Sequence, residues 1–218
     1  NNTTLSIINT KSNNNTSSIM VNSKAAGTSV LCLNGENAAL HILNGVDIVM
    51  GTDGYYAWNG NYAYCIEVVN GKELIVNGAD IYNWMYWGSG IAFSNYDDGA
   101  FNNFSFKVLN DSEITAKVAC IDFTFTNTLP GKSYVQDCKL SYETKIPNFD
   151  DGREAAPKKD FMAIKAVDDD FVLVDVLAEG YIVEYANIGA YVDSKDLIKD
   201  FPMGVNVFVD ECYDHDYK

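Results

Sequence analysis

The opening fifty residues repeat one short pattern, which is LSIIN at residues 5–9, IMVN at 19–22, VLCLN at 30–34 and LHILN at 40–44. In each copy an apolar stretch ends on an asparagine, and the four asparagines follow one another at intervals of 13, 12 and 10 residues. Such an interval fits one β-strand plus one turn, and it leaves no room for a helix of ordinary length. The pattern therefore predicts a β-structure in which every unit contributes one strand.

A unit of this length cannot bury its own apolar side chains. They must be covered by stacked neighbouring repeats or by other copies of the same chain. We therefore expect a fibrous β-repeat segment over residues 1–50.

The composition describes a folded, acidic chain. Of the 218 residues, 47% are hydrophobic and 21% are charged, and the formal net charge is −15. A charge of this sign opposes binding to nucleic acid phosphates or to anionic membrane surfaces. We therefore expect no nucleic acid partner. No apolar run is long enough to span a bilayer, so we expect no membrane insertion either.

The cysteines indicate a reducing folding compartment. There are five, an odd number, and they form neither a Cys-x-x-Cys pair nor a zinc-type spacing. Most lie inside apolar patterns, which favours free buried thiols over a disulfide framework. Such a chain can still function outside the cell after it has folded.

Signals typical of β-strands continue beyond the repeat. The alternation of apolar residues slips by one position between Cys120 and Ile121, which predicts a β-bulge. The pair Asn70-Gly71 lies between two apolar runs, Ile66–Val69 and Glu73–Val76, and predicts a hairpin. The chain is therefore predicted to be all-β.

Two boundaries divide the predicted fold. Prolines and acidic turns cluster at residues 146–160, and glycines mark a softer boundary near residues 51–54. We expect an N-terminal fibrous β-repeat segment (1–50) followed by one or two small β-sandwich or barrel domains, an aromatic-rich β-domain (51–148) and an acidic β-domain (149–218). A single continuous β-domain over residues 40–148 is the alternative.

The repeat spacing, the Asn- and Ser-rich linkers and the LSIINT opening at residues 5–10 resemble the β-helical shafts of bacteriophage tail fibres and receptor-binding proteins. The resemblance covers about fifty residues. It implies a homotrimer in a virion outside the cell, folded in the host cytoplasm and joined to other virion proteins through a segment upstream of Asn1. It also implies a β-rich tip that binds a host cell-surface glycan.

The residues suited to glycan binding lie between positions 55 and 96. This window holds all three tryptophans and seven tyrosines. Aromatic rings stack on the apolar faces of sugars, while amides and carboxylates bond to the hydroxyl groups. The predicted ligand-binding residues are Tyr55, Tyr56, Trp58, Asn59, Asn61, Tyr82, Trp84, Trp87 and Tyr96. The alternative is that these rings form a domain core or a trimer interface.

Catalytic, metal and cofactor sites are not predicted. Histidine occurs only at His41 and His215, which leaves few ways to assemble a catalytic triad. The acidic clusters lack EF-hand spacing, and solvated turns explain them. We therefore expect no enzyme activity, no metal and no cofactor, with a ligand-free structural β-protein as the alternative and a glycan-degrading fibre as a weaker one.

Overall fold

A computed structural model describes residues 2–10, 17–23, 27–51, 62–85, 87–126, 128, 130, 132–135, 138–142, 162–166, 176–178, 181–185, 190–191 and 207–209. The described residues contain strands and turns and no helix. The all-β prediction is therefore confirmed for this part of the chain. The strands are β1 (Thr3–Ile8), β2 (Ser17–Val21), β3 (Thr28–Asn34), β4 (Ala38–Leu43), β5 (Val46–Met50), β6 (Ala63–Asn70), β7 (Glu73–Asn77), β8 (Asp80–Asn83), β9 (Gly88–Asn95), β10 (Ser105–Leu109), β11 (Glu113–Ala116), β12 (Ala119–Thr126), β13 (Lys132–Val135), β14 (Cys138–Tyr142), β15 (Met162–Ala166), β16 (Val176–Ala178), β17 (Tyr181–Tyr185), β18 (Ala190–Tyr191) and β19 (Val207–Val209).

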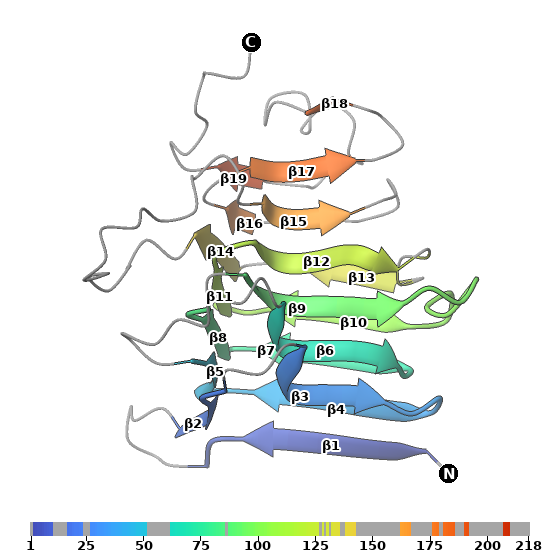
Figure 1. Cartoon of the computed structure of the whole chain (residues 1–218). Helices are drawn as coiled ribbons and strands as arrows, with labels where there is room; N and C mark the ends of the chain where they lie inside the picture. Colours follow the sequence, from blue (N-terminus) through green and yellow to red (C-terminus); the bar gives the residue numbers. More distant parts are fainter. Residues whose placement is uncertain are drawn as a thin grey trace.

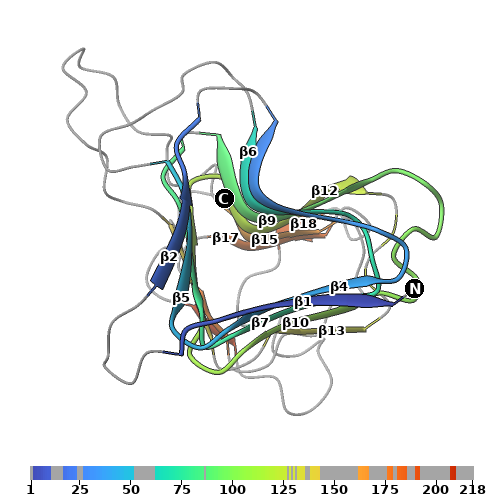
Figure 2. The ribbon, with the colours of Figure 1, turned by 90° about the horizontal axis from the view of Figure 1, so that it is seen from below.

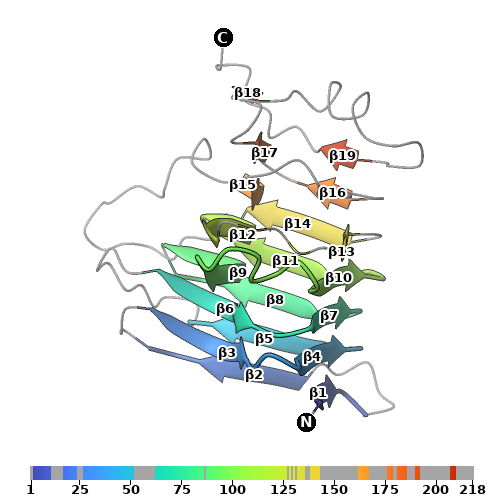
Figure 3. The ribbon, with the colours of Figure 1, turned by 90° about the vertical axis from the view of Figure 1, so that its right-hand side faces the viewer.

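The strands form three sheets that wind together as a β-solenoid (Figure 1). Sheet A has the order β1-β4-β7-β10-β13, sheet B has β19-β16-β14-β11-β8-β5-β2, and sheet C has β18-β17-β15-β12-β9-β6-β3. From β1 to β15, three consecutive strands thus enter three different sheets and complete one coil, whereas the described strands β16 to β19 belong to sheets B and C. The strands of successive coils stack as parallel neighbours, which the side view makes plain (Figure 3).

The N-terminal repeat is one side of a coil, so three units make a complete coil. The first three copies lie on β1, β2 and β3, and the fourth lies on β4, directly above the first. In the parallel register Leu5 pairs with Leu40, and Ile7 pairs with Ile42. Of the two ways to cover the apolar face, the chain therefore uses stacked neighbouring repeats of its own.

The same three sheets continue past residue 51. Strand β3 pairs with β6, β4 with β7 and β5 with β8, and each pairing is parallel. The hairpin predicted around Asn70-Gly71 is therefore wrong, because β6 lies in sheet C and β7 in sheet A. Described strands on both sides of residues 51 and 148 share these sheets. The division into domains, and an acidic domain over residues 149–218 that lies largely outside the described residues, stay predictions.

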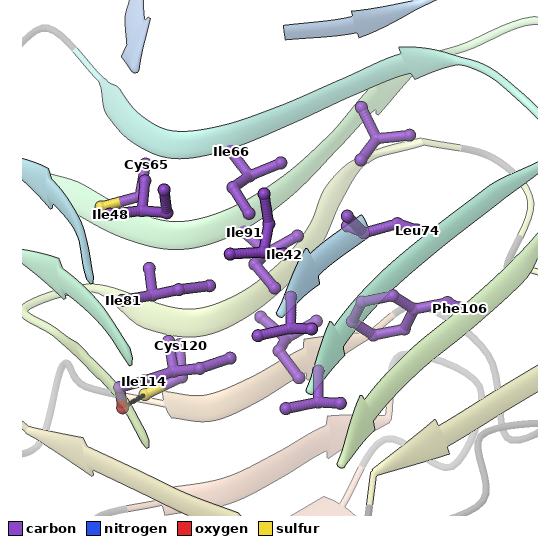
Figure 4. Packing of buried hydrophobic residues seen from close by; sticks show 14 of the residues in the cluster. Ile42, Ile48, Cys65, Ile66, Leu74, Ile81, Ile91, Phe106, Ile114 and Cys120 are labelled. Carbon is purple, nitrogen blue, oxygen red and sulfur yellow. Dashed lines mark hydrogen bonds between the residues drawn. The ribbon is translucent and has the colours of Figure 1, made fainter. Parts of the chain in front are cut away.

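The interior consists of stacked columns of apolar side chains (Figure 4). On sheet B, Ile48, Ile81 and Ile114 occupy equivalent positions in successive coils, and all three are fully buried. Burial of one such side chain stabilises the fold by about 1.5–3 kcal/mol. On neighbouring strands of sheet C, Phe93 stacks on Phe123 with the ring centroids 4.7 Å apart. Stacking thus gives each short strand the hydrophobic cover that it lacks alone.

Asparagines mark the corner between sheets A and B. Asn9, Asn44 and Asn110 each follow a strand of sheet A and Asn77 ends one, and the four lie at intervals of 35, 33 and 33 residues. The side-chain amide of Asn9 donates to the carbonyl of Gly45 at 3.1 Å, and that of Asn110 donates to Asn77 Oδ1 at 2.8 Å. Gly45 and Gly78 have φ angles of 69° and 62°, as Asn-Gly turns require. Here the turns join strands of different sheets.

Sheet C is sharply bent, and Figure 2 shows the bend in β6 and β9 along the solenoid axis. At the bend two consecutive residues of a strand are fully buried, as Cys65 and Ile66 are on β6. The Cys65 thiol donates to the carbonyl of Tyr82 at 3.2 Å, and the Cys120 thiol donates to that of Ile114 at 3.1 Å. The slip of the alternation at Cys120 therefore corresponds to this bend, while the register between β9 and β12 shifts later, between Asp122 and Phe125.

Candidate functional site

The structure separates the predicted ligand-binding residues. Tyr55, Tyr56, Trp58, Asn59 and Asn61 lie outside the described residues, so their role stays a prediction. Tyr82 lies on β8 in sheet B, Trp84 and Trp87 lie between β8 and β9, and Tyr96 directly follows β9. Tyr82 and Tyr96 are therefore associated with different sheets, although they are close in the sequence.

The tryptophans lie where the chain passes from sheet B to sheet C. Trp84 is half-buried, and its backbone N–H donates to the carbonyl of Met50 at 2.9 Å. The carbonyl of Trp87 accepts a hydrogen bond from Ala63, which places Trp87 beside Tyr62 at the entrance of neighbouring strands. Trp87 and Tyr62 are 40% and 42% exposed, so aromatic surface is available at this end of sheet C.

Three rings meet on the outer side of sheet C. The ring centroids of Tyr62 and Phe125 are 5.0 Å apart in an edge-to-face arrangement, and those of Tyr64 and Phe125 are 6.2 Å apart. Tyr62 precedes β6, whereas Phe125 lies near the end of β12. Because these positions belong to opposite arms of the bent strands, the rings contact each other across the bend. Tyr96, which is 60% exposed, follows the same arm as Phe125.

Carboxylates accompany these rings. Glu67 and Asp122 lie in one column of sheet C with Ala92 between them. Glu67 is partly exposed and accepts a hydrogen bond from Ser29 Oγ at 3.4 Å. Asp122 is buried, and it accepts hydrogen bonds from Ser89 Oγ at 2.9 Å and from the Thr124 backbone N–H at 2.9 Å.

Tyr64 lies close enough to the other rings and to both carboxylates for their charges to act on it. Burial raises the pKa of Tyr64, and the charges of Asp122 and Glu67 raise it further, with smaller contributions from Tyr62 and Tyr96. Tyr64 therefore keeps its hydroxyl proton and can donate it in a hydrogen bond. We name this set the bend surface, and it comprises Tyr62, Tyr64, Glu67, Tyr96, Asp122 and Phe125.

The bend surface offers the exposed rings of Tyr62 and Tyr96 and the partly exposed carboxylate of Glu67, whereas Tyr64 is buried beneath them. Exposed Tyr96 and Tyr62 present rings that can cover an apolar face of a ligand. Glu67 can accept hydrogen bonds from ligand hydroxyl groups, whereas Asp122 is satisfied by protein donors and holds β9 and β12 together. This combination fits recognition of a neutral, hydroxyl-rich molecule.

Sheet B carries a second polar feature, the acidic column of Asp47, Asp80 and Glu113. These residues stack in register on the outer face, and Lys139 follows Glu113 with its Nζ 3.3 Å from Glu113 Oε1. The hydroxyl of Tyr82 donates to Asp80 Oδ2 at 3.3 Å. Burial raises the pKa of Tyr82, and the negative charge of Asp80 raises it further. The Tyr82 side chain thus contacts the acidic column and is not part of the bend surface.

The sequence indicated only part of this site. The aromatic window contained Tyr62, Tyr64 and Tyr96. Glu67, Asp122 and Phe125 were not predicted as site residues, because each lies in an ordinary strand pattern. Their proximity depends on the length of a coil and on the bend. Glu67 pairs with Ala92, and Ala92 pairs with Asp122, at unequal sequence separations, so a search at one constant spacing would not have aligned them.

The described part of the chain contains no group of three or more His, Cys, Asp or Glu side chains able to hold a metal ion, and no helix long and apolar enough to cross a membrane. Four of the five cysteines are described, and they are free thiols; Cys65, Cys120 and Cys138 are buried as predicted, whereas Cys32 is exposed.

Comparison with known proteins gives no match: no family model fits the sequence, and no curated protein or solved structure is similar to it.

Proposed function

We propose that this chain is a non-enzymatic carbohydrate-binding β-solenoid, a fibre or adhesin component that contacts a cell-surface glycan through the bend surface. The observation that carries the proposal is the cluster of Tyr62, Tyr64 and Phe125 across the bend, with Glu67 beside it and Tyr96 exposed. Rings that present a face to solvent next to a hydrogen-bonding carboxylate suit the two-sided chemistry of a sugar.

The physical properties of the chain favour this ligand class over charged ones. A net charge of −15 disfavours anionic polymers, and Glu67 adds an acceptor where a neutral sugar offers hydroxyl donors. A rigid parallel sheet also fixes the positions of the rings, which reduces the ordering cost of binding. Action as a homotrimer within a virion fibre, with attachment through an upstream segment, stays a prediction from the resemblance.

A glycan array followed by titration calorimetry tests the proposal. Tyr96→Ala removes the most exposed ring of the bend surface, and we expect the affinity for the best glycan to fall tenfold or more. Tyr134→Ala removes a ring on sheet A with a comparable exposed fraction of 44%, and we expect it to leave the affinity unchanged. Equal losses in the two variants, or no binding to any glycan, would contradict the proposal.

A ligand-free structural role is the main alternative. In that case the rings across the bend serve only as a small outer core. Tyr62→Ala would then lower the free energy of unfolding, and no ligand would protect the bend surface from hydrogen exchange. This alternative is excluded if the unmodified chain binds a glycan and if Tyr96→Ala loses that binding while its free energy of unfolding is unchanged.

A further inference from the structure

The hydroxyl group of Tyr64 is buried without a hydrogen-bond partner. Tyr64 is 6% exposed, and the centroid of its ring lies 6.2 Å from that of Phe125. Among the described residues, no group donates a hydrogen bond to this hydroxyl or accepts one from it. Buried polar groups in folded proteins are nearly always hydrogen-bonded, and an exception calls for a partner from elsewhere.

The Tyr64 phenol lies near two carboxylates on the far arm of the bend. Burial raises the pKa of Tyr64, and the negative charges of Asp122 and Glu67 raise it further, so the phenol stays protonated. Its oxygen is therefore close enough to feel both charges, yet it bonds to neither carboxylate. The Tyr64 hydroxyl is thus a donor whose proton has no acceptor within the described part of the chain.

The two carboxylates differ in how much acceptor capacity they keep. Asp122 is buried, and it accepts from Ser89 Oγ with Oδ2 and from the Thr124 backbone N–H with Oδ1, each at 2.9 Å. Glu67 is partly exposed and accepts from Ser29 Oγ with Oε2 at 3.4 Å. Among the described residues, Glu67 Oε1 has no hydrogen-bond donor, so Glu67 supplies the acceptor that is open to a ligand.

Tyr64 and Glu67 thus offer one donor and one acceptor on the same strand, β6, on the two sides of the bend at Cys65 and Ile66. A hydroxyl group both donates and accepts hydrogen bonds, so it can bond to both side chains at once. A ligand carboxylate has no proton for Glu67, and a ligand ammonium group has no lone pair for Tyr64. The pair therefore favours a neutral hydroxyl group over either charged group.

We propose that Tyr64 and Glu67 together hold one hydroxyl group of the glycan, with Tyr64 donating to its oxygen and Glu67 Oε1 accepting its proton. This inference rests on the proposed function, and it names an unsubstituted hydroxyl group as the feature that the bend surface recognises. The Tyr62 ring is 42% exposed and precedes β6, and exposed side chains change rotamer readily. Rotation of Tyr62 away from Phe125 thus admits the hydroxyl group to Tyr64.

Titration calorimetry with the methyl glycosides of glucose, galactose, mannose and N-acetylglucosamine tests this contact. Tyr64→Phe removes only the hydroxyl, and we expect the affinity for the best-bound glycoside to fall about tenfold. The free energy of unfolding should not fall, because no hydrogen bond within the protein is lost. Tyr134→Phe removes a hydroxyl from an exposed ring on sheet A and should leave the affinity unchanged.

Monodeoxy analogues of the best-bound glycoside identify the hydroxyl group that is held. On the analogue that lacks it, Tyr64→Phe and Glu67→Gln should cause no further loss of affinity, whereas both substitutions keep their effect on the other analogues. A Tyr64→Phe variant that binds as tightly as the unmodified chain, or that is less stable, would overturn the inference. Cancellation of the two substitutions by two different analogues would overturn it as well.

The outcomes also separate this inference from the proposed function. If Tyr64→Phe has no effect but Tyr96→Ala loses binding, the bend surface binds a glycan and the role of Tyr64 is wrong. If none of the four glycosides binds, the inference is overturned. The proposed function is overturned with it only if the glycan array shows no binding either.

Discussion

Gly90 shows how a single residue permits the bend of sheet C. A Cβ atom at this position would lie 2.6 Å from the carbonyl oxygen of Cys120 and in contact with the Ile114 side chain. Ile114 is fully buried, so it cannot move away without disturbing the interior column. The close approach of sheets B and C thus depends on the absence of a side chain here.

We predict that Gly90→Ala lowers the free energy of unfolding by about 1–3 kcal/mol, because it overpacks the interior. Urea denaturation monitored by tyrosine and tryptophan fluorescence measures this change. Gly35→Ala is the control, since its Cβ would meet only the Ala38 Cβ at 3.2 Å in a partly exposed turn. Equal effects at the two positions would show that the space around Gly90 is not limiting.

Asp80 is a second residue whose surroundings predict a measurable effect. Burial raises the pKa of Asp80, the Glu113 backbone N–H lowers it, and the negative charges of Asp47 and Glu113 raise it again, so that the net shift is upward. The folded state therefore binds this proton more tightly than the unfolded state does. Ionised Asp80 consequently costs stability above its folded pKa, and the cost disappears as the pH falls below the unfolded pKa.

We therefore expect Asp80→Asn to raise the free energy of unfolding at pH 7 by about 0.5 kcal/mol, the scale of one cross-strand pair. The gain should vanish near pH 3, where the aspartate is protonated in both states. Thermal denaturation across this pH range provides the measurement, with exposed Asp98→Asn as the control. A stability loss at pH 7 would mean that the bond from Tyr82 outweighs the repulsion.

At the scale of elements, the asparagine corners show why an Asn-Gly pair does not by itself predict a hairpin; at Asn70-Gly71, where the hairpin was predicted, neither residue has a positive φ. Asn44-Gly45 and Asn77-Gly78 have the positive φ values expected of tight Asn-Gly turns at Gly45 and Gly78. A turn type fixes the local direction of the chain, but it does not fix which strand the chain pairs with next. In the solenoid, pairing with the coil above replaces pairing across the turn.

The hydrogen bond between Asn77 and Asn110 tests whether these corners stabilise the stacking of coils. We predict that Asn77→Ala and Asn110→Gly show a coupling energy of about 0.5–1 kcal/mol in a double-mutant cycle. Glycine is used at position 110 because its φ is 51°, which alanine would resist. Urea denaturation of the four proteins supplies the energies, and strict additivity would mean that the bond contributes nothing.

At the scale of the whole molecule, burial depends on position along the solenoid axis. Ile19, Ile48 and Ile81 belong to one column of sheet B, and their burial is partial in the first coil and complete in the next two. The same side chain therefore contributes differently according to how many coils cover it.

We predict that Ile81→Ala costs about 3–4 kcal/mol, while Ile19→Ala costs about 1 kcal/mol because its cavity opens to solvent. Urea denaturation of the two variants and the unmodified chain provides the comparison. Equal costs would indicate that the first coil is covered as fully as the middle of the solenoid.

The sequence by itself determined the β-character and the length of a unit. The alternation of apolar residues and the asparagines at the end of each unit are local signals, and the structure confirms both. It also indicated free cysteines, which the four described ones confirm. These properties depend on neighbouring residues and on composition, which a single sequence displays directly.

Only the tertiary structure decided that three units make a coil and that Tyr62, Glu67, Asp122 and Phe125 share one surface. The spacing between equivalent strands varies from coil to coil, so no constant period reveals the register. The bend at Cys65, Gly90 and Cys120 then brings together residues from opposite arms of sheet C. These contacts arise from long-range packing of one coil on the next, and that packing is settled by the fit of the whole interior.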